Sequence, residues 1–234
     1  MASPSNSEYI SGGYFVVKPI QRPEGPFSLL PRTLITLSSC LAAIAPDAWT
    51  MAWGNNTREE AAEHVAKFEV PAHLAPELVD WVKAETPVGQ YPNAFLSLQK
   101  ACEFVRRFVV GDGVEIVGIG LHKSLLPSFY GQIEKDANRG YGLLERVELK
   151  ESLAEGGGIL GYEPLGFETT HFHTWLCHYM PDEAQRLFGV RPNENGLIDD
   201  LQGAIQVTEH MVRTGAEAAI WEPWLLVKYA AERR

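Results

Sequence analysis

The chain has 234 residues, of which 45% are hydrophobic and 21% charged, proportions that are typical of folded proteins and exclude extensive disorder. Its formal net charge of -10 at pH 7 disfavours nucleic acid and anionic membranes as partners, because like charges repel. The same acidity fits either a protein that is kept soluble by its charge or one that attracts a basic protein partner.

Two features predict a cytoplasmic location. Cys40, Cys102 and Cys177 are odd in number and widely separated, which argues against a disulfide framework and fits a reducing compartment. The beginning of the chain lacks the basic and apolar pattern of a secretion signal, and the apolar run Leu34–Ala45 is much shorter than the ~20 residues that span a bilayer.

The sequence predicts a flexible start at residues 1–10 and a single domain over residues 11–234. Tyr14–Val17 is an aromatic and β-branched run that Pro19 ends, which favours a strand. The apolar patch Trp49–Trp53 is a second, weaker strand candidate. Thr57 and Glu60 have the spacing of a capping box, so we expect a helix from Thr57 to about Phe68.

The middle of the chain alternates between helix and strand patterns. Pro76–Lys83 predicts a short helix that begins at a proline. Apolar residues spaced by three and four over Phe95–Val109 predict an amphipathic helix, and Val114–Leu121 follows as an apolar strand. A turn is expected at Pro127, and an ordered run resumes at residues 139–144.

The C-terminal third begins at the glycines 156–158, where residues 155–158 mark either a tight turn or a subdomain boundary. Ile159–Phe167 predicts a strand that Pro164 would place at a sheet edge or a bulge. Helices are expected over Pro181–Phe188 and Asp199–Thr214, and a strand over Trp224–Tyr229. Together these elements predict an α/β or α+β protein, with a mixed β-sheet flanked by four or five helices.

His171, His173 and His178, with Cys177 beside them, are the residues best suited to bind a metal. Their spacing matches no common zinc pattern, and the neighbouring Trp175 favours a buried element instead. A metal-dependent enzyme that uses the three histidines therefore stays an alternative hypothesis.

No phosphate loop, dinucleotide fingerprint, nucleophile elbow or paired-cysteine metal motif occurs in the sequence. Glu163, Glu168, Asp182 and Glu183 are carboxylates of a kind that acid and base catalysis uses, but their spacing selects no pair. The sequence thus favours a protein that is not an enzyme and uses no cofactor.

Four aromatic residues near the C-terminus belong to the types that anchor protein interfaces, namely Trp175, Tyr179, Trp221 and Trp224. The competing interpretation is core packing, since tryptophan and tyrosine are commonly buried. They are the sequence's candidates for partner binding.

Several segments of the C-terminal half carry a resemblance to known proteins: Tyr141-Gly142-Leu143, Ile159–Glu163, Leu165–Glu168, Phe172–Cys177, Asn195–Ile198, Gly215-Ala216-Glu217 and Trp221–Val227. From about Gly140 to Tyr229 the chain resembles a loose group of bacterial immunity proteins that are encoded beside polymorphic or contact-dependent toxins. The resemblance implies a small, acidic, cytoplasmic α/β protein that binds a cognate toxin and blocks it without a cofactor. An adaptor or chaperone that holds an effector is a further alternative.

Overall fold

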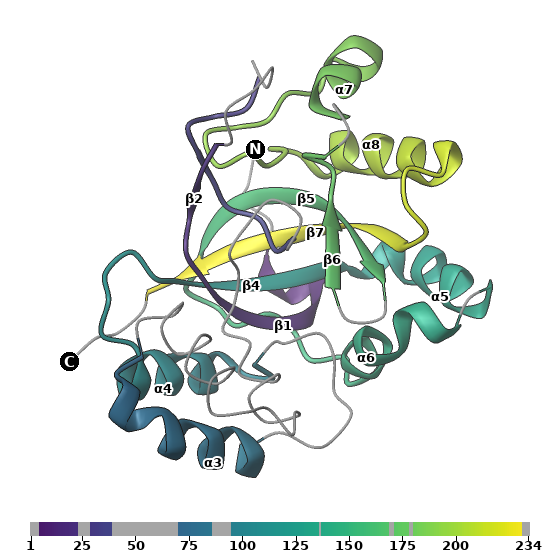
Figure 1. The fold of residues 1–234 in the computed structure, drawn as a ribbon. Helices are drawn as coiled ribbons and strands as arrows, with labels where there is room; N and C mark the ends of the chain where they lie inside the picture. Colours follow the sequence, from purple (N-terminus) through teal and green to yellow (C-terminus); the bar gives the residue numbers. More distant parts are fainter. Residues whose placement is uncertain are drawn as a thin grey trace.

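The computed structural model describes residues 5–22, 29–38, 70–85, 95–135, 137–168, 171–177 and 180–230. Its centre is a twisted five-stranded sheet with the strand order β1-β4-β7-β5-β6 (Figure 1). The strands are β1 (Tyr9–Val17), β4 (Glu115–His122), β5 (Gly158–Glu168), β6 (His171–Thr174) and β7 (Ile220–Tyr229). Every neighbouring pair is antiparallel. The predicted α/β or α+β class is therefore confirmed, and the four predicted strands that lie within the described residues are present.

A second, two-stranded sheet pairs β2 (Ile20–Gln21) with β3 (Thr33–Leu34). The described residues also form the α-helices α3 (Ala75–Glu85), α4 (Leu98–Phe108), α5 (Leu126–Lys135), α6 (Ala137–Glu148), α7 (Met180–Phe188) and α8 (Leu201–Thr214). Short 3-10 turns precede three elements, namely η1 (Asn6–Glu8), η2 (Ala72–Leu74) and η3 (Lys123–Leu125). Helices thus flank the sheet as predicted, and α5 and α6 are two helices that the sequence analysis does not name.

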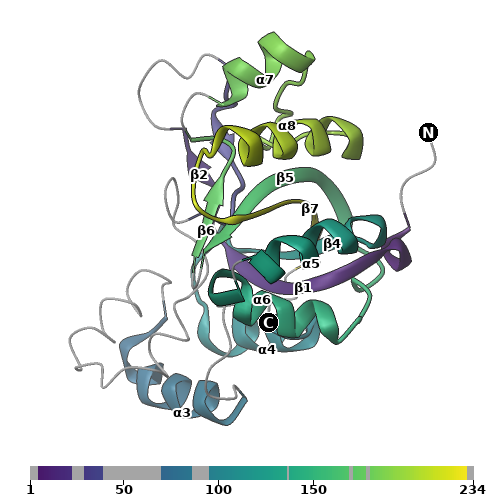
Figure 2. The ribbon, with the colours of Figure 1, turned by 90° about the vertical axis from the view of Figure 1, so that its right-hand side faces the viewer.

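Each face of the sheet buries its own hydrophobic cluster. One cluster takes its helical residues from α3, α4, α7 and α8, and the other takes them from α5 and α6. Figure 2 shows α5 and α6 in front of the strands and α8 above β5. Helices thus cover both faces, so the sheet residues alternate between two apolar environments.

Local signals explain why the best-predicted helices begin and end where they do. Ser97 accepts a hydrogen bond from the amide of Lys100 at the start of α4, and Asp200 accepts one from Gly203 at the start of α8. α8 ends at Gly215, whose φ of 65° is the left-handed conformation that glycine adopts most easily. These caps confirm the helices that the spacing predicts.

Two segments differ from the expectation. Residues 5–10, expected to be flexible, form η1 and the beginning of β1, and Tyr9 and Ile10 are buried. A turn is expected at Pro127, but this segment is helical. Pro127 is the second residue of α5, and in the first turn of a helix the missing amide hydrogen costs no helical hydrogen bond. A proline in the first turn of a helix and a proline in a loop turn thus give the same pattern in the sequence.

Strand β5 is not an edge strand, because β6 pairs with its outer side. Its bulge lies between Ile159 and Gly161, and Pro164 faces Pro223 of β7. The backbone of Tyr162 bonds to Ile198, on the side away from β7, and Pro164, two residues further on, shares this orientation. The ladder between β5 and β7 therefore does not need the amide hydrogen that Pro164 lacks.

Some predictions concern residues outside the described part of the chain. They are the helix from Thr57 to Phe68 and the apolar patch Trp49–Trp53. Both stay predictions. The suggested boundary near residues 155–158 falls within described residues, where the chain enters β5.

Candidate functional site

The site begins where β4 ends. The pairing between β4 and β7 stops at Leu121 and Trp224, after which the chain turns through η3 into α5. Among the described residues, no strand therefore pairs with the first residues of β7 on this side. The side chain of Gln132, on α5, takes the place of a strand: its Nε2 donates to the carbonyl of Trp221 at 2.9 Å, and its Oε1 accepts from the amide of Trp221 at 3.0 Å.

The same amide group orients a buried carboxyl. Gln132 Nε2 also donates to Glu222 Oε1 at 2.8 Å, and Ser128 gives a second hydrogen bond. Glu222 is only 2% exposed. Burial raises the pKa of Glu222 to about 7, and the two hydrogen bonds only partly oppose this rise.

Glu222 lies at a cleft of about 430 Å³ between α5 and α8. Apolar wall residues include Leu125 and Pro127 from the α5 side, and Ile205 and Val212 from α8. Charged side chains also line the cleft, namely Lys135, Glu209 and Arg213, all of which are exposed. A cleft of this size, with apolar walls and one buried titratable group, has the form of a ligand site.

The chemistry open to this cleft follows from its carboxyl. With a pKa of about 7, Glu222 changes between a neutral acid and a carboxylate near neutral pH. It can therefore exchange a proton with a bound group or bind a cation. Sequence reasoning missed Glu222 and Gln132. The sequence contains one signal for Glu222, namely a single acidic residue inside the apolar run Ile220–Val227. Such a residue is noticeable because burying a carboxylate without a polar or charged partner costs free energy.

Replacing Glu222 with glutamine is expected to stabilise the protein at high pH. The pKa of Glu222 is 4.5 in an ordinary environment and about 7 in the folded protein. Below pH 4.5 the carboxyl is neutral in both the folded and the unfolded state, and the protein has its full stability. As the pH rises from 4.5 through 7, the unfolded state ionises first and the free energy of unfolding falls. Glutamine cannot ionise. At pH 8.5 Glu222→Gln should therefore exceed the wild type by up to about 3 kcal/mol in unfolding free energy, since one pKa unit corresponds to about 1.4 kcal/mol.

Urea unfolding at pH 4.5 and 8.5 measures this difference. At pH 4.5 the two proteins should be nearly equal. The matched control is Glu209→Gln, which removes an exposed carboxylate of the same cleft and should change stability by less than about 0.5 kcal/mol. A Glu222→Gln variant that is less stable than the wild type at pH 8.5 would contradict the assigned pKa.

Glu163 is a second buried carboxyl, on β5. Its Oε1 accepts hydrogen bonds from Thr36 and, at 2.6 Å, from Thr174, and its Oε2 lies 3.4 Å from the amide nitrogen of Leu37. Burial raises its pKa to about 7 as well. Glu163 does not line the cleft. Its partners belong to residues 29–38 and to β6, so it joins residues 36 and 37 to the sheet.

The other predicted carboxylates have structural partners. Glu168 Oε2 lies 3.1 Å from His173 Nε2, and Glu183 lies 3.2 Å from Arg186 and 3.5 Å from His210. Asp182 is exposed in the first turn of α7, where an acidic residue is favourable. The structure brings none of these three into the cleft with Glu222.

The predicted metal ligands are only partly described. His173, on β6, contacts Glu168, whereas the side chain of His171 and all of His178 lie outside the described residues. Within the described part of the chain, no group of three His, Cys, Asp or Glu residues is arranged to hold a metal ion. The metal hypothesis therefore stays a prediction.

The predicted interface aromatics are core residues wherever the structure describes them. Trp175 is 0% exposed, and Trp221 and Trp224 are each 1% exposed. Tyr179 lies outside the described residues. Trp221 is one of the residues that line the cleft, but its ring lies against Gly166, where an added Cβ would lie 2.5 Å from the indole. These tryptophans fill the space between sheet and helices and present almost no surface to a partner.

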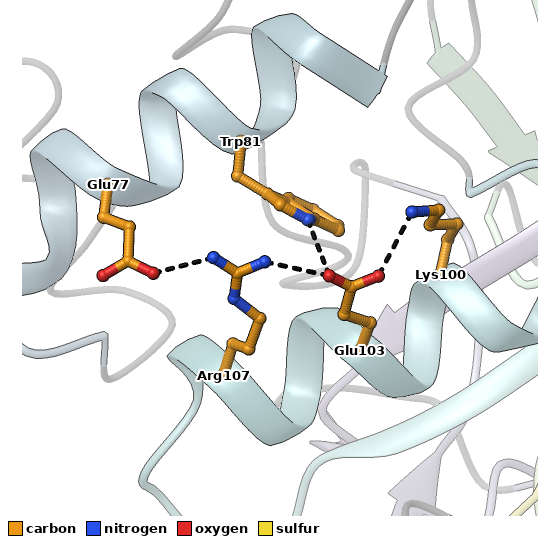
Figure 3. A network of polar contacts seen from close by, with 5 residues as sticks. All are labelled: Glu77, Trp81, Lys100, Glu103 and Arg107. Carbon is orange, nitrogen blue, oxygen red and sulfur yellow. Dashed lines mark hydrogen bonds and ion pairs between the residues drawn. The ribbon is translucent and has the colours of Figure 1, made fainter.

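A polar network joins α3 to α4 at another surface (Figure 3). Arg107 contacts Glu77 at 2.7 Å and Glu103 at 2.9 Å, while Trp81 Nε1 and Lys100 also donate to Glu103. Burial acts to raise the pKa of Glu103, but hydrogen bonds from Arg107, Lys100 and Trp81 together lower it below its usual value. The network connects two helices, so we assign it a structural role.

The described helices include none with the length and apolarity needed to cross a lipid bilayer. Comparisons of the chain with protein-family models, with curated proteins and with solved structures gave no match.

Proposed function

We propose that the protein is a non-catalytic binding protein of the immunity type, which neutralises a basic bacterial toxin by direct contact in the cytoplasm of the producing cell. The observation that carries this proposal is the formal charge of -10. Charge of this size attracts a basic protein over several ångströms and raises the rate of encounter. The resemblance of the C-terminal half to immunity proteins supplies the class of partner.

The cleft between α5 and α8 supports the same proposal. It combines apolar walls with a buried carboxyl, which is the pattern of a pocket that receives an anchor residue from a partner. The mechanism requires no cofactor and no reaction step, because occupation of the toxin's active surface is sufficient to block it.

Coexpression provides the test. The product of the adjacent upstream gene should stop growth when it is expressed alone, and this protein should restore growth when it is present. Purified proteins should form a complex whose affinity falls as salt rises, because the steering charges are screened. A non-toxic neighbour, or toxicity that persists with this protein present, would refute the proposal. Binding without neutralisation would favour the adaptor or chaperone alternative.

A further inference from the structure

Glu222 is a buried carboxyl without a cationic partner in the described part of the chain. The groups that affect its pKa are the surrounding apolar mass, Ser128 and Gln132, all of them uncharged. A buried carboxylate is costly unless a positive charge and hydrogen bonds replace its lost water. When Glu222 is ionised, its negative charge therefore has no positive charge in contact with it among the described residues.

The other charged side chains near Glu222 do not balance its negative charge. Lys135 on α5 and Arg213 on α8 are exposed, and Arg213 Nη2 lies 3.0 Å from His210 Nδ1. Glu209, on α8, is an exposed carboxylate of the same cleft, and Glu163 lies on the neighbouring strand β5 with partners of its own. Water screens the exposed charges, so none of them substitutes for a cation in contact with Glu222.

The cleft walls define the rest of the ligand. Leu125, Pro127, Ile205 and Val212 line the same cleft as the carboxyl and offer apolar contact to a ligand there. A ligand that fits both features has a flexible apolar stem and a positively charged end, as the long side chains of arginine and lysine do. A guanidinium also donates several hydrogen bonds in a plane, which suits a carboxylate.

We infer that the cleft between α5 and α8 receives an arginine or lysine side chain of a basic partner protein, with its charged end in contact with Glu222. The choice of a protein as the source of the cation rests on the proposed function. The chemistry of the pocket itself, an alkyl cation against a buried carboxylate, rests on the cleft and on the missing counter-charge.

The first experiment uses n-butylguanidinium as the probe and follows it by NMR titration of the full-length protein. With a pKa of about 7, Glu222 is about ten times more ionised at pH 8 than at pH 6. We therefore expect about tenfold tighter binding at pH 8. Glu222→Gln should weaken binding at pH 8 at least tenfold and abolish this pH dependence.

Two controls make the result specific. Glu209→Gln removes a carboxylate of the same cleft, and this variant should keep the pH dependence and bind within about threefold of the wild type. Butyrate, of similar size and opposite charge, should not bind. Equal binding to Glu222→Gln, or wild-type affinity that is the same at pH 6 and 8, would overturn the inference, and the second outcome does not depend on the folding of any variant.

A second experiment identifies the source of the cation. The peptide Ac-Ala-Arg-Ala-NH2 should bind at least as tightly as n-butylguanidinium, and its citrulline analogue, which is neutral, should not bind. If the peptide is excluded while n-butylguanidinium binds, the ligand is a free small cation and the protein source is refuted. These titrations need no toxin, so failure of the immunity proposal and failure of this inference give different results.

Discussion

Replacing Trp221 with alanine is expected to lower the free energy of unfolding by about 3–5 kcal/mol. The indole is 1% exposed, packs against Gly166 and donates from Nε1 to the carbonyl of Glu217 at 3.2 Å. Alanine would leave a large cavity between β7 and α8. Thermal and urea unfolding should both report the loss, with a fall in Tm of roughly 10 °C for a chain of this size.

The control for Trp221→Ala is Leu187→Ala, because Leu187 is a large apolar residue of α7 that is 42% exposed. Its loss should change stability by less than about 0.5 kcal/mol. The experiment separates the two interpretations of the aromatic residues. If Trp221→Ala weakens partner binding and leaves stability unchanged, Trp221 is an interface anchor and the core assignment is wrong.

Replacing Glu163 with alanine is expected to cost about 3 kcal/mol of stability at pH 6. The substitution leaves a cavity, and it removes the acceptor shared by Thr36, Thr174 and the amide of Leu37. Buried donors that lose their acceptor are expensive, and at pH 6 most of the wild-type Glu163 is neutral and pays little for burial. Urea unfolding of both proteins at this pH measures the difference.

Hydrogen exchange gives a local test of the same contact. The amide of Leu37 should exchange at least tenfold faster in Glu163→Ala. The amide of Ile35 donates to the carbonyl of Asn195 at 3.0 Å, a bond that does not involve Glu163, so it should keep most of its protection. Unchanged exchange at Leu37 would show that Glu163 does not hold residues 35–38 against the sheet.

The sequence predicts the elements better than their arrangement, and the reason is physical. α4 and α8 are recognisable because a 3.6-residue apolar period and capping side chains are local features. The order β1-β4-β7-β5-β6 depends on contacts between distant segments, which no local period encodes. Pro164 illustrates the limit: the residue suggests an edge strand, whereas its acceptability depends on which side of β5 faces β7.

The candidate site was less predictable than the fold. Gln132 acts through a pairing with Trp221 that joins residues 89 positions apart, and nothing near Gln132 in the sequence indicates it. Glu222 carried a usable signal, since an acidic residue rarely interrupts an apolar strand. The tryptophans were ambiguous because the residue types that anchor interfaces are also those that fill cores.

The position of β7 also has a consequence for biosynthesis. This strand joins β4 to β5 at the centre of the sheet, yet it is the last strand of the described chain to leave the ribosome. The pairs β1-β4 and β5-β6 are translated earlier. Until β7 is available, the edges of β4 and β5 that it later joins stay unpaired. Completion of the sheet is thus a late, non-local event, and the nascent chain is exposed to misassociation until residues 220–229 emerge.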